Sequence, residues 1–431
     1  DDKAKVFASF QAGKKITTDM IAAATGIFTP RWVVRYLVEN SLGRLWMEMH
    51  PDSALEEKMA YLVPSSGDST SRPLKLVREI LFLDPSCGSM HFGLVAFDLF
   101  VEMYREEIMF AGQPGWPAKA SVVTEADIPS AIVACNIHGI DLDPRAVQIS
   151  ALTLLIKARG LNPKAIVTDH NLACCNVEAI TGGRLSTIIQ GAKFDQPVYE
   201  RILSSMASRL KDSDNLGSLL RPERDLDRLI DEEQGKLDRS MGLLPGMGET
   251  DLFTLDTHEK REKFFSGLTA NISLQLDTFV RQSRTMGKDE KHFVGETAKG
   301  LNFLRLVQQR YDVVATNPPY LDSRDYNAVH KAYLEAEFPS AKRNLFAAFI
   351  KRCLELIDPN GYVGMLTGQS FMFISSYEAL RNEILQDASI ATLAQYDYHL
   401  FKERVDTAAF VLRAEPDAKR RQADVGVYFR L

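Results

Sequence analysis

The fold prediction rests on a change from strand to turn within the stretch Tyr311-Asp312-Val313-Val314-Ala315-Thr316-Asn317-Pro318-Pro319-Tyr320. Its first half is a short β-branched run, typical of a buried strand. The two prolines cannot continue that strand, because each lacks the backbone N–H that strand pairing requires. The chain therefore turns at the strand's carboxyl end, the edge where open α/β sheets keep their active sites.

The turn carries groups that suit an amino group on a planar ring. Pro318 favours extended backbone at Asn317, whose side-chain carbonyl is a hydrogen-bond acceptor. The backbone carbonyl of Pro318 is a second acceptor, and Tyr320 offers an aromatic face for stacking. We predict that Asn317, Pro318, Pro319 and Tyr320 are catalytic and bind the exocyclic amine of a base. The alternative is a plain tight turn, because Asn-Pro and Pro-Pro pairs are common in loops.

Length and composition are those of an ordinary soluble globular protein. The 431 residues predict two or three domains, and no apolar run reaches the roughly 18 residues of a membrane-spanning helix. The net charge of −6 gives no general basic footprint for nucleic acid. Five cysteines without a C-x-x-C pair indicate neither a metal site nor a disulfide framework, so we expect a cytoplasmic protein. The chain starts without methionine and ends in a strand-like stretch, which predicts a longer protein.

A helix is predicted from Thr29 to Asn40. Thr29 is the expected N-cap, and Pro30 the first helical residue. Val33 and Leu37 belong to an apolar stripe at helical spacing, which predicts one buried face.

The next candidate site follows a predicted strand at Leu81 to Leu83. The sequence from Asp84 to Gly93 is rich in small residues, and an apolar helix follows it. A strand, a small-residue turn and a helix together place backbone N–H groups against a ligand. The turn is looser than G-x-G-x-x-G and does not specify a dinucleotide.

Two further strands are predicted to end in carboxylates. Asp141 follows Gly139-Ile140 and is predicted to accept the two hydroxyl groups of a ribose. Asp143 precedes Pro144 and is predicted to cap the helix that begins there. Asp169 follows the predicted strand from Ala165 to Thr168 and is expected to bind an adenine amino group. The alternative for Asp169 is a loop carboxylate in water.

Strands and helices continue to alternate after Tyr320. We predict a helix that starts at Asn344, a strand from Tyr362 to Thr367 and a helix from Phe371 to Gln386. The segment from Ile390 to Arg413 is predicted to form a β-hairpin that closes one edge of the sheet.

In this order the motifs resemble those of the γ-type amino-methyltransferases, which use S-adenosylmethionine and usually modify adenine in DNA. The matching motifs are Phe28-Thr29-Pro30, Asp84-Pro85-Ser86-Cys87-Gly88-Ser89, Asp141, Asp169 and Asn317-Pro318-Pro319-Tyr320. The stretches at 27–34, 40–46 and 88–93 are similar to the large adenine methyltransferases of BREX phage-defence systems, the PglX type.

This resemblance implies a doubly wound, mostly parallel α/β sheet of the class I S-adenosylmethionine-dependent methyltransferase type, which is Rossmann-like, with a helical insertion. It implies site-specific N6-methylation of adenine in double-stranded DNA, with the adenine flipped out, in a BREX or restriction-modification system. Other defence subunits and a phage-encoded inhibitor are implied partners. The residues implied to bind the cofactor are Phe28, Thr29, Pro30, Asp84, Pro85, Cys87, Gly88, Ser89, Asp141, Leu142, Asp169, His170 and Asn317.

Two alternatives to this function stay open. Protein-glutamine and ribosomal-RNA methyltransferases also carry Asn-Pro-Pro-Tyr on this fold. The chain could also be a DNA-binding scaffold with partner-dependent or no methylation. Most γ-type enzymes have glycine in place of Met90, and a side chain there is expected to narrow the methionine end of the cofactor pocket.

The resemblance also divides the chain. We predict an N-terminal helical segment at 1–27, the cofactor half of the core at 28–172 and a helical insertion at 173–300. The catalytic half of the core is predicted at 301–413, and the start of a further region at 414–431. The charge runs of the insertion are most simply solvated faces.

Overall fold

A computed structural model describes residues 29–64, 72–167, 170–176, 210, 212–224, 299–300, 302–396 and 406–431. The chain divides into two compact units. The first comprises Asp1–Leu172 and Arg310–Leu431, and the second comprises Ala173–Gln309. Among its described residues the second unit contains α10 (Ser213–Leu216).

One sheet has the strand order β3-β2-β1-β4-β5-β7-β6-β8. β1, β2, β4 and β5 are mutually parallel, β7 is antiparallel to β5 and β6, and β8 is parallel to β6. The predicted doubly wound, mostly parallel sheet is therefore confirmed. The strands are β1 (Phe82–Asp84), β2 (Ile137–Asp141), β3 (Asn171–Cys174), β4 (Tyr311–Thr316), β5 (Ile357–Gly368), β6 (Ala388–Tyr396), β7 (Thr407–Ala414) and β8 (Val427–Arg430).

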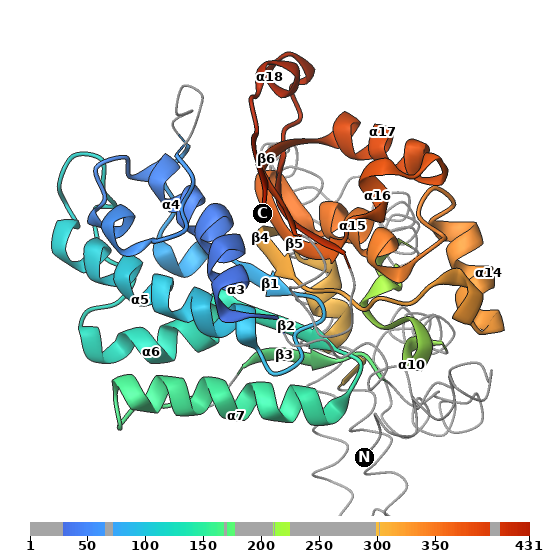
Figure 1. Cartoon of the computed structure of the whole chain (residues 1–431). Coiled ribbons are helices and arrows are strands. Elements are labelled where there is room, and N and C mark those ends of the chain that lie inside the picture. Colours follow the sequence, from blue (N-terminus) through green and yellow to red (C-terminus); the bar gives the residue numbers. More distant parts are fainter. Residues whose placement is uncertain are drawn as a thin grey trace, which may run out of the picture. The chain divides into compact units, whose positions relative to one another are not determined.

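Helices cover both faces of this sheet. α3 and α5 lie on one side, and α15 and α17 lie on the other (Figure 1). All six residues of β4 are buried, as expected for a strand covered on both faces. The described α-helices of the first unit are α3 (Arg31–Val38), α4 (Arg44–Met49), α5 (His91–Phe110), α6 (Ile128–Ala131), α7 (Pro144–Leu161), α14 (Ala328–Glu337), α15 (Leu345–Leu356), α16 (Ser370–Phe373), α17 (Glu378–Asp387) and α18 (Ala418–Ala423).

The predicted apolar stripe of α3 is fully buried. Val33 and Leu37 are 0% exposed, and Val34 is 1% exposed. Burying side chains of this size stabilises a fold by about 1.5–3 kcal/mol each. The stripe packs on α5 and on the sheet at β5 and β7, which holds the start of α3 beside the carboxyl ends of the strands.

The third predicted strand is wrong in position. The described residues of that stretch, Ala165 to Val167, form no strand, and Ile166 is 72% exposed. β3 begins later, at Asn171, where Leu172 is buried. Ala165 instead donates its N–H to the carbonyl of Asn162 in a turn that ends α7.

Two later elements also differ from their predictions. The helix predicted from Phe371 to Gln386 is divided into α16, a 3₁₀ turn at Ser375–Tyr377 and α17. The β6–β7 hairpin does not end the sheet, because β8 pairs with β6 on its outer side.

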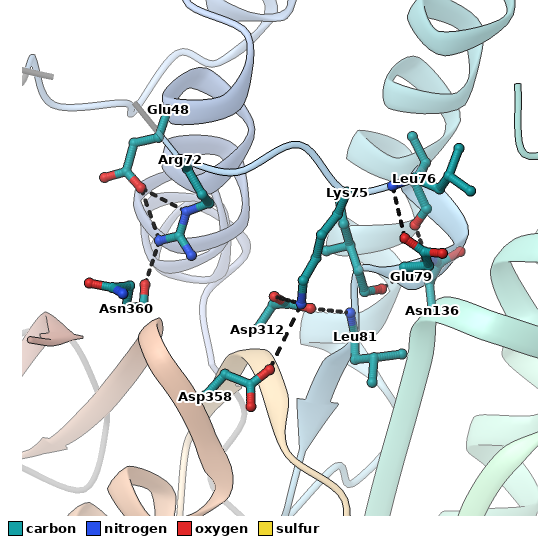
Figure 2. Close-up of polar contacts among 12 residues, drawn as sticks. Glu48, Arg72, Lys75, Leu76, Glu79, Leu81, Asn136, Asp312, Asp358 and Asn360 are labelled. Carbon is teal, nitrogen blue, oxygen red and sulfur yellow. Dashed lines mark hydrogen bonds and ion pairs between the residues drawn. The ribbon is translucent and has the colours of Figure 1, made fainter. Parts of the chain in front are cut away.

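Figure 2 shows contacts at the starts of the strands, opposite the predicted catalytic turn. Lys75 Nζ lies 2.6 Å from Asp312 Oδ1, and the N–H of Leu81 donates to Asp312 Oδ2 at 2.9 Å. Arg72 pairs with Glu48 at 2.9 Å. The contacts with Asp312 fasten the segment before β1 to the start of β4, and the Arg72 pair fastens it to α4. In the described part of the chain, no helix has the length and apolar character needed to cross a membrane.

Candidate active site

The carboxyl ends of β1, β2, β4 and β5 lie at one edge of the sheet. In the strand register Asp84 is opposite Gly139, and Thr316 is opposite Met365. The predicted cofactor turn, residues 84–89, therefore begins beside the predicted catalytic turn, residues 317–320.

A chain of hydroxyl groups joins these two turns. Thr316 Oγ1 donates to Asp84 Oδ1 at 2.6 Å and lies 2.6 Å from Ser86 Oγ. Because Thr316 donates its one hydroxyl proton to Asp84, Ser86 Oγ is the donor in the bond between Ser86 and Thr316. Ser86 Oγ also lies 3.3 Å from the backbone oxygen of Asn317, so its one proton is shared between that oxygen and Thr316 Oγ1. The backbone of the catalytic turn is thus tied to the cofactor turn.

Asp84 is the buried end of this chain. Its residue is 1% exposed, and the N–H of Ser86 donates to Oδ1 at 3.1 Å. Burial raises the pKa of Asp84 to about 7, although the bonds from Thr316 and Ser86 favour the ionised form. The carboxylate thus holds the start of the cofactor turn against the end of β4.

The side chain of Asn317 meets the start of α3. Asn317 Nδ2 donates to Thr29 Oγ1 at 2.9 Å, and Thr29 is 6% exposed. The prediction that Thr29 caps the helix is wrong, because Pro30 occupies the N-cap position without a side-chain cap. The hydroxyl of Thr29 contacts the catalytic turn instead. Since Nδ2 faces Thr29, Oδ1 on the other side of the planar amide faces away from Thr29.

Tyr320 is held at two places. Its hydroxyl donates to the backbone oxygen of Leu366 at 2.8 Å. Its ring lies 5.9 Å from the ring of Phe346, at an interplanar angle of 71°. Burial raises the pKa of Tyr320 well above its usual value, so the hydroxyl stays a donor. The ring is therefore fixed in orientation before any ligand binds.

Asp141 organises the cofactor turn from the neighbouring strand. The N–H of Gly88 donates to Oδ2 at 2.8 Å, and the N–H of Asp143 donates to Oδ1 at 2.8 Å. Burial raises the pKa of Asp141, and these backbone donors oppose that rise. The predicted cap is confirmed, because Asp143 accepts the N–H of Arg145 at 2.9 Å.

Gly88 has a conformation that favours glycine. Its φ is +53°, and a Cβ built there would have no other heavy atom within 4 Å. Its carbonyl accepts a hydrogen bond of 2.8 Å from Ser150 Oγ on α7. The turn is thus held from behind by α7 and faces open space at Gly88.

Residues 135–401 of the chain match the model of the Eco57I restriction-modification methylase family. The match runs from the start of β2, through the catalytic turn, to beyond β6. The chain belongs to the Eco57I restriction-modification methylase family.

Relatives of this Eco57I-family chain include two named adenine-specific methyltransferases. BrxX of Escherichia coli O9:H4 (strain HS) is 28% identical over 93% of this chain and 31% of the relative. PglX of Lacticaseibacillus casei (strain Zhang) is 28% identical over 98% of this chain and 32% of the relative. The chain therefore spans about a third of the length of these relatives. These matches confirm the resemblance to the PglX type.

A solved structure of DrdV in complex with DNA has a TM-score of 0.45 and 12% identity, covering 95% of this chain and 28% of that chain.

Not all predicted ligand residues of this Eco57I-family chain can be placed. Phe28 and Asp169 lie outside the described residues, so their predicted roles stay predictions. His170 is exposed and its ring nitrogen Nδ1 accepts the N–H of Leu172 at 3.4 Å. Leu142, next to Asp141, is half-buried.

The expectation that Met90 narrows the cofactor pocket is wrong. Met90 is 0% exposed and has a left-handed φ of 69° at the N-cap of α5. A Cβ built at Gly93 would lie 2.3 Å from Met90 Sδ, and one built at Gly139 would lie 2.5 Å from Met90 Cε. The side chain therefore fills space left by two glycines in the core behind the turn.

Two residues that position the site were missed in the sequence. No role is predicted for Thr316, which begins the quoted turn, or for Ser150. A single hydroxyl residue in a strand or helix is too common to signal a role. Their partners, Asp84 and Gly88, lie far away in the sequence.

Proposed function

We propose that this chain is a site-specific methyltransferase that modifies the N6 amine of adenine in double-stranded DNA with S-adenosylmethionine. The observation that carries the proposal is the meeting of three distant segments at Asn317. Thr29 accepts its side-chain N–H, and Ser86 of the cofactor turn donates to its backbone oxygen. The names of the BrxX and PglX relatives support adenine as the acceptor.

The cofactor turn fits S-adenosylmethionine. An ionised carboxylate has about four acceptor positions, so the N–H bonds to Asp141 from Gly88 and Asp143 do not exhaust its capacity for ribose hydroxyl groups. The open space beside Gly88 allows close approach of a ligand to the backbone. Asp169 is the proposed partner of the cofactor's adenine amino group. When bound, the cofactor supplies an electrophilic methyl group on a positively charged sulfur.

The catalytic turn supplies acceptors for a weak nucleophile. The lone pair of an aromatic amine is delocalised into the ring, which lowers its reactivity. Acceptance of the two amine hydrogens by Asn317 Oδ1 and the Pro318 carbonyl localises that lone pair on nitrogen. Because Thr29 holds Nδ2, the oxygen of the amide is presented in one orientation. Positioning and local dipoles thus lower the barrier.

Tyr320 is proposed to stack on the target adenine. An amine inside a duplex is out of reach, so the base has to be flipped out of the helix. The fixed ring of Tyr320 then offers a preformed platform, since its hydroxyl bond and its T-shaped contact with Phe346 already set its orientation. Pro319 and Pro318 stiffen the turn between the two working side chains.

The resemblance to the PglX type and membership of a restriction-modification methylase family support a role in phage defence. Methylation of host DNA would mark it as self in a BREX or restriction-modification system. Such a role places the protein in the cytoplasm, with other defence subunits and a phage-encoded inhibitor as candidate partners. The alternative of a scaffold without methylation rested on Met90 narrowing the cofactor pocket. The side chain of Met90 lies in the core, so that support is removed.

Transfer of radiolabelled methyl groups to unmethylated plasmid DNA, ribosomal RNA and a protein mixture tests the proposal. We expect labelled N6-methyladenine in the DNA alone. Asn317→Ala is expected to abolish this labelling while the affinity for S-adenosylmethionine is retained, because the amide contacts the acceptor base.

A matched control is Asn215→Ala, which removes an asparagine amide from the second unit. It is expected to leave methyl transfer unchanged. Label in RNA or protein instead of DNA would assign the same chemistry to a different acceptor. Turnover of Asn317→Ala near that of the unmodified protein would contradict the catalytic assignment.

A further inference from the structure

Two large apolar side chains are exposed at the catalytic edge of the sheet. Phe373 is 62% exposed and Ile374 is 48% exposed. Phe373 is the last residue of α16 and Ile374 is its C-cap, and α16 begins just after the carboxyl end of β5. We call these two residues the apolar pair. Burial of two such neighbouring side chains would stabilise the fold, so their exposure indicates a surface that binds a partner.

The backbone that presents the apolar pair is held firmly. Arg381 Nη1 donates to the carbonyl of Phe371 at 2.9 Å and to that of Ile374 at 2.8 Å. The N–H of Ile374 also donates to the carbonyl of Ser370 at 3.1 Å. The ring of Phe371 packs inward, 5.3 Å from that of Phe410. One aromatic side chain therefore anchors the turn and the next, Phe373, is held out of it.

Ring contacts link this turn to the catalytic tyrosine. The ring of Phe346 lies 5.9 Å from that of Tyr320 and 6.3 Å from that of Tyr377. The N–H of Tyr377 donates to the carbonyl of Ile374 at 3.1 Å. The backbone of the apolar pair is thus connected to Tyr320 through Tyr377 and Phe346, and we call these residues the aromatic layer.

Two exposed cations lie beside the aromatic layer. Lys342 and Arg343 precede α15, and among the described residues neither has an ion-pair partner. The carbonyl of Arg343 accepts the N–H of Ser323, just after the catalytic turn, at 2.8 Å. Burial raises the pKa of Tyr377 to about 12; the negative charge of Asp322 adds to that rise and the positive charge of Arg343 opposes it. We call Lys342 and Arg343 the cation pair.

We infer that the apolar pair and the cation pair together form the surface that holds duplex DNA next to the target base. This inference rests on the proposed function. Flipping a base leaves a gap in the stack, and apolar side chains that enter base steps stabilise such distorted DNA. Phe373 and Ile374 contact the bases at this gap, and Lys342 and Arg343 neutralise phosphates of the flanking backbone.

The chemistry favours DNA over a protein partner. The whole chain carries a net charge of −6, yet this edge presents two adjacent cations without ion pairs among the described residues. Apolar wedges flanked by Lys and Arg suit a substrate that has stacked bases between two phosphate chains. The surface also lies near Asn317 and Tyr320, so DNA that delivers a base to the catalytic turn would contact it.

Two double variants of the full chain test the inference. Phe373→Ala with Ile374→Ala removes the apolar pair, and Leu385→Ala is its control. Leu385 is 54% exposed but lies near the end of α17, which leads to the opposite edge of the sheet. Lys342→Gln with Arg343→Gln removes the cation pair. Its control is Lys419→Gln, an exposed lysine of α18, which follows β7 at that opposite edge.

Methyl transfer to unmethylated plasmid DNA is measured for each variant, together with the salt dependence of binding to the same DNA. Loss of the apolar pair is expected to raise the KM for DNA about 10-fold, with the KM for S-adenosylmethionine unchanged. Loss of the cation pair is expected to flatten the slope of log K against log salt by about 0.9 per cation. The two controls are expected to match the unmodified protein.

The outcomes separate the inference from the proposed function. If the unmodified protein methylates DNA and both double variants keep its KM for DNA and its salt slope, the inference is overturned and the function stands. If the unmodified protein transfers no methyl group to DNA, the function fails, and the binding measurement alone decides the inference. Weaker DNA binding in both double variants then supports it, and unchanged binding overturns it.

Discussion

Replacing Met90 with alanine is expected to destabilise the fold while leaving the affinity for S-adenosylmethionine nearly unchanged. Met90 is fully buried, and its sulfur and terminal methyl group fill the space beside Gly93 and Gly139. Removing a buried methionine side chain costs about 2–5 kcal/mol. Alanine keeps the Cβ at a residue with a φ of 69°, so the backbone strain stays and the loss reports packing.

A second substitution measures the same contact from the other side. A Cβ at Gly93 would lie 2.3 Å from Met90 Sδ, 2.8 Å from Met90 Cγ and 3.1 Å from Ile137 Cγ2. Gly93→Ala alone is expected to cost about 1–3 kcal/mol, as overpacked cores do. With Met90→Ala the two closest atoms are gone, and the better helix propensity of alanine, worth about 0.5–1 kcal/mol, offsets the remainder. The double variant should therefore be more stable than Met90→Ala alone.

Gly139→Ala is the matched comparison for this cycle. Its Cβ would still meet Leu172 Cδ2 at 2.9 Å and Cys87 Cβ at 3.2 Å after Met90 is shortened. Rescue by Met90→Ala is therefore expected to be smaller at Gly139 than at Gly93. Urea unfolding followed by circular dichroism gives the stabilities, and calorimetric titration gives the cofactor affinity. Unchanged unfolding with 10-fold tighter cofactor binding in Met90→Ala would place the side chain in the pocket and refute the core placement.

Three shorter predictions address the hydroxyl groups and the buried carboxylate. Thr316→Val is expected to lower kcat about 100-fold with the KM for S-adenosylmethionine within about two-fold, because the catalytic turn is misplaced, and Thr316→Ser should restore most of the rate in steady-state assays. Thr29→Val leaves the amide N–H of Asn317 without its acceptor and is expected to lower kcat about 5- to 150-fold, whereas Thr29→Ser should resemble the unmodified protein; equal rates for the valine variant would contradict this role. Burial raises the pKa of Asp84 to about 7, so the folded state holds this proton more tightly than the unfolded state does. The free energy of unfolding should therefore fall as the pH rises from about 4 to 7, by up to about 1.4 kcal/mol per pH unit. Urea unfolding of Asp84→Asn should lack this pH dependence.

The features predicted correctly from the sequence are those fixed by nearby residues. The β-branched run before Asn317 forms β4, and Asp143 caps the helix that starts at Pro144. Val33 and Leu37 are buried as their spacing indicates. In each case the pattern and the structure involve residues within one or two turns of each other, so local propensity and burial point to the same answer.

The features that were missed or wrong depend on distant partners. The bond from Asn317 to Thr29 spans 288 residues, and the bond from Thr316 to Asp84 spans 232. Met90 shows the same limit in part, since some of the space that receives its side chain is made by Gly139 on β2. A sequence pattern states what a side chain can do, and only the fold states which partner it meets.

The hydroxyl of Thr29 could cap α3 or bind the side chain of Asn317, and in the structure it binds Asn317. A threonine cap would stabilise α3 by about 1 kcal/mol. The first-turn residues Arg31 and Trp32 are exposed, so water can satisfy their N–H groups and the missing cap costs little. The amide of Asn317 has no such substitute, because a half-turn about its terminal bond would exchange oxygen and nitrogen at the acceptor site. Holding Nδ2 on Thr29 therefore gains more for the proposed chemistry than capping would gain for the helix. Thr29→Val separates the two uses: since α3 has no side-chain cap to lose, the fall in rate and any loss of stability both report the bond to Asn317.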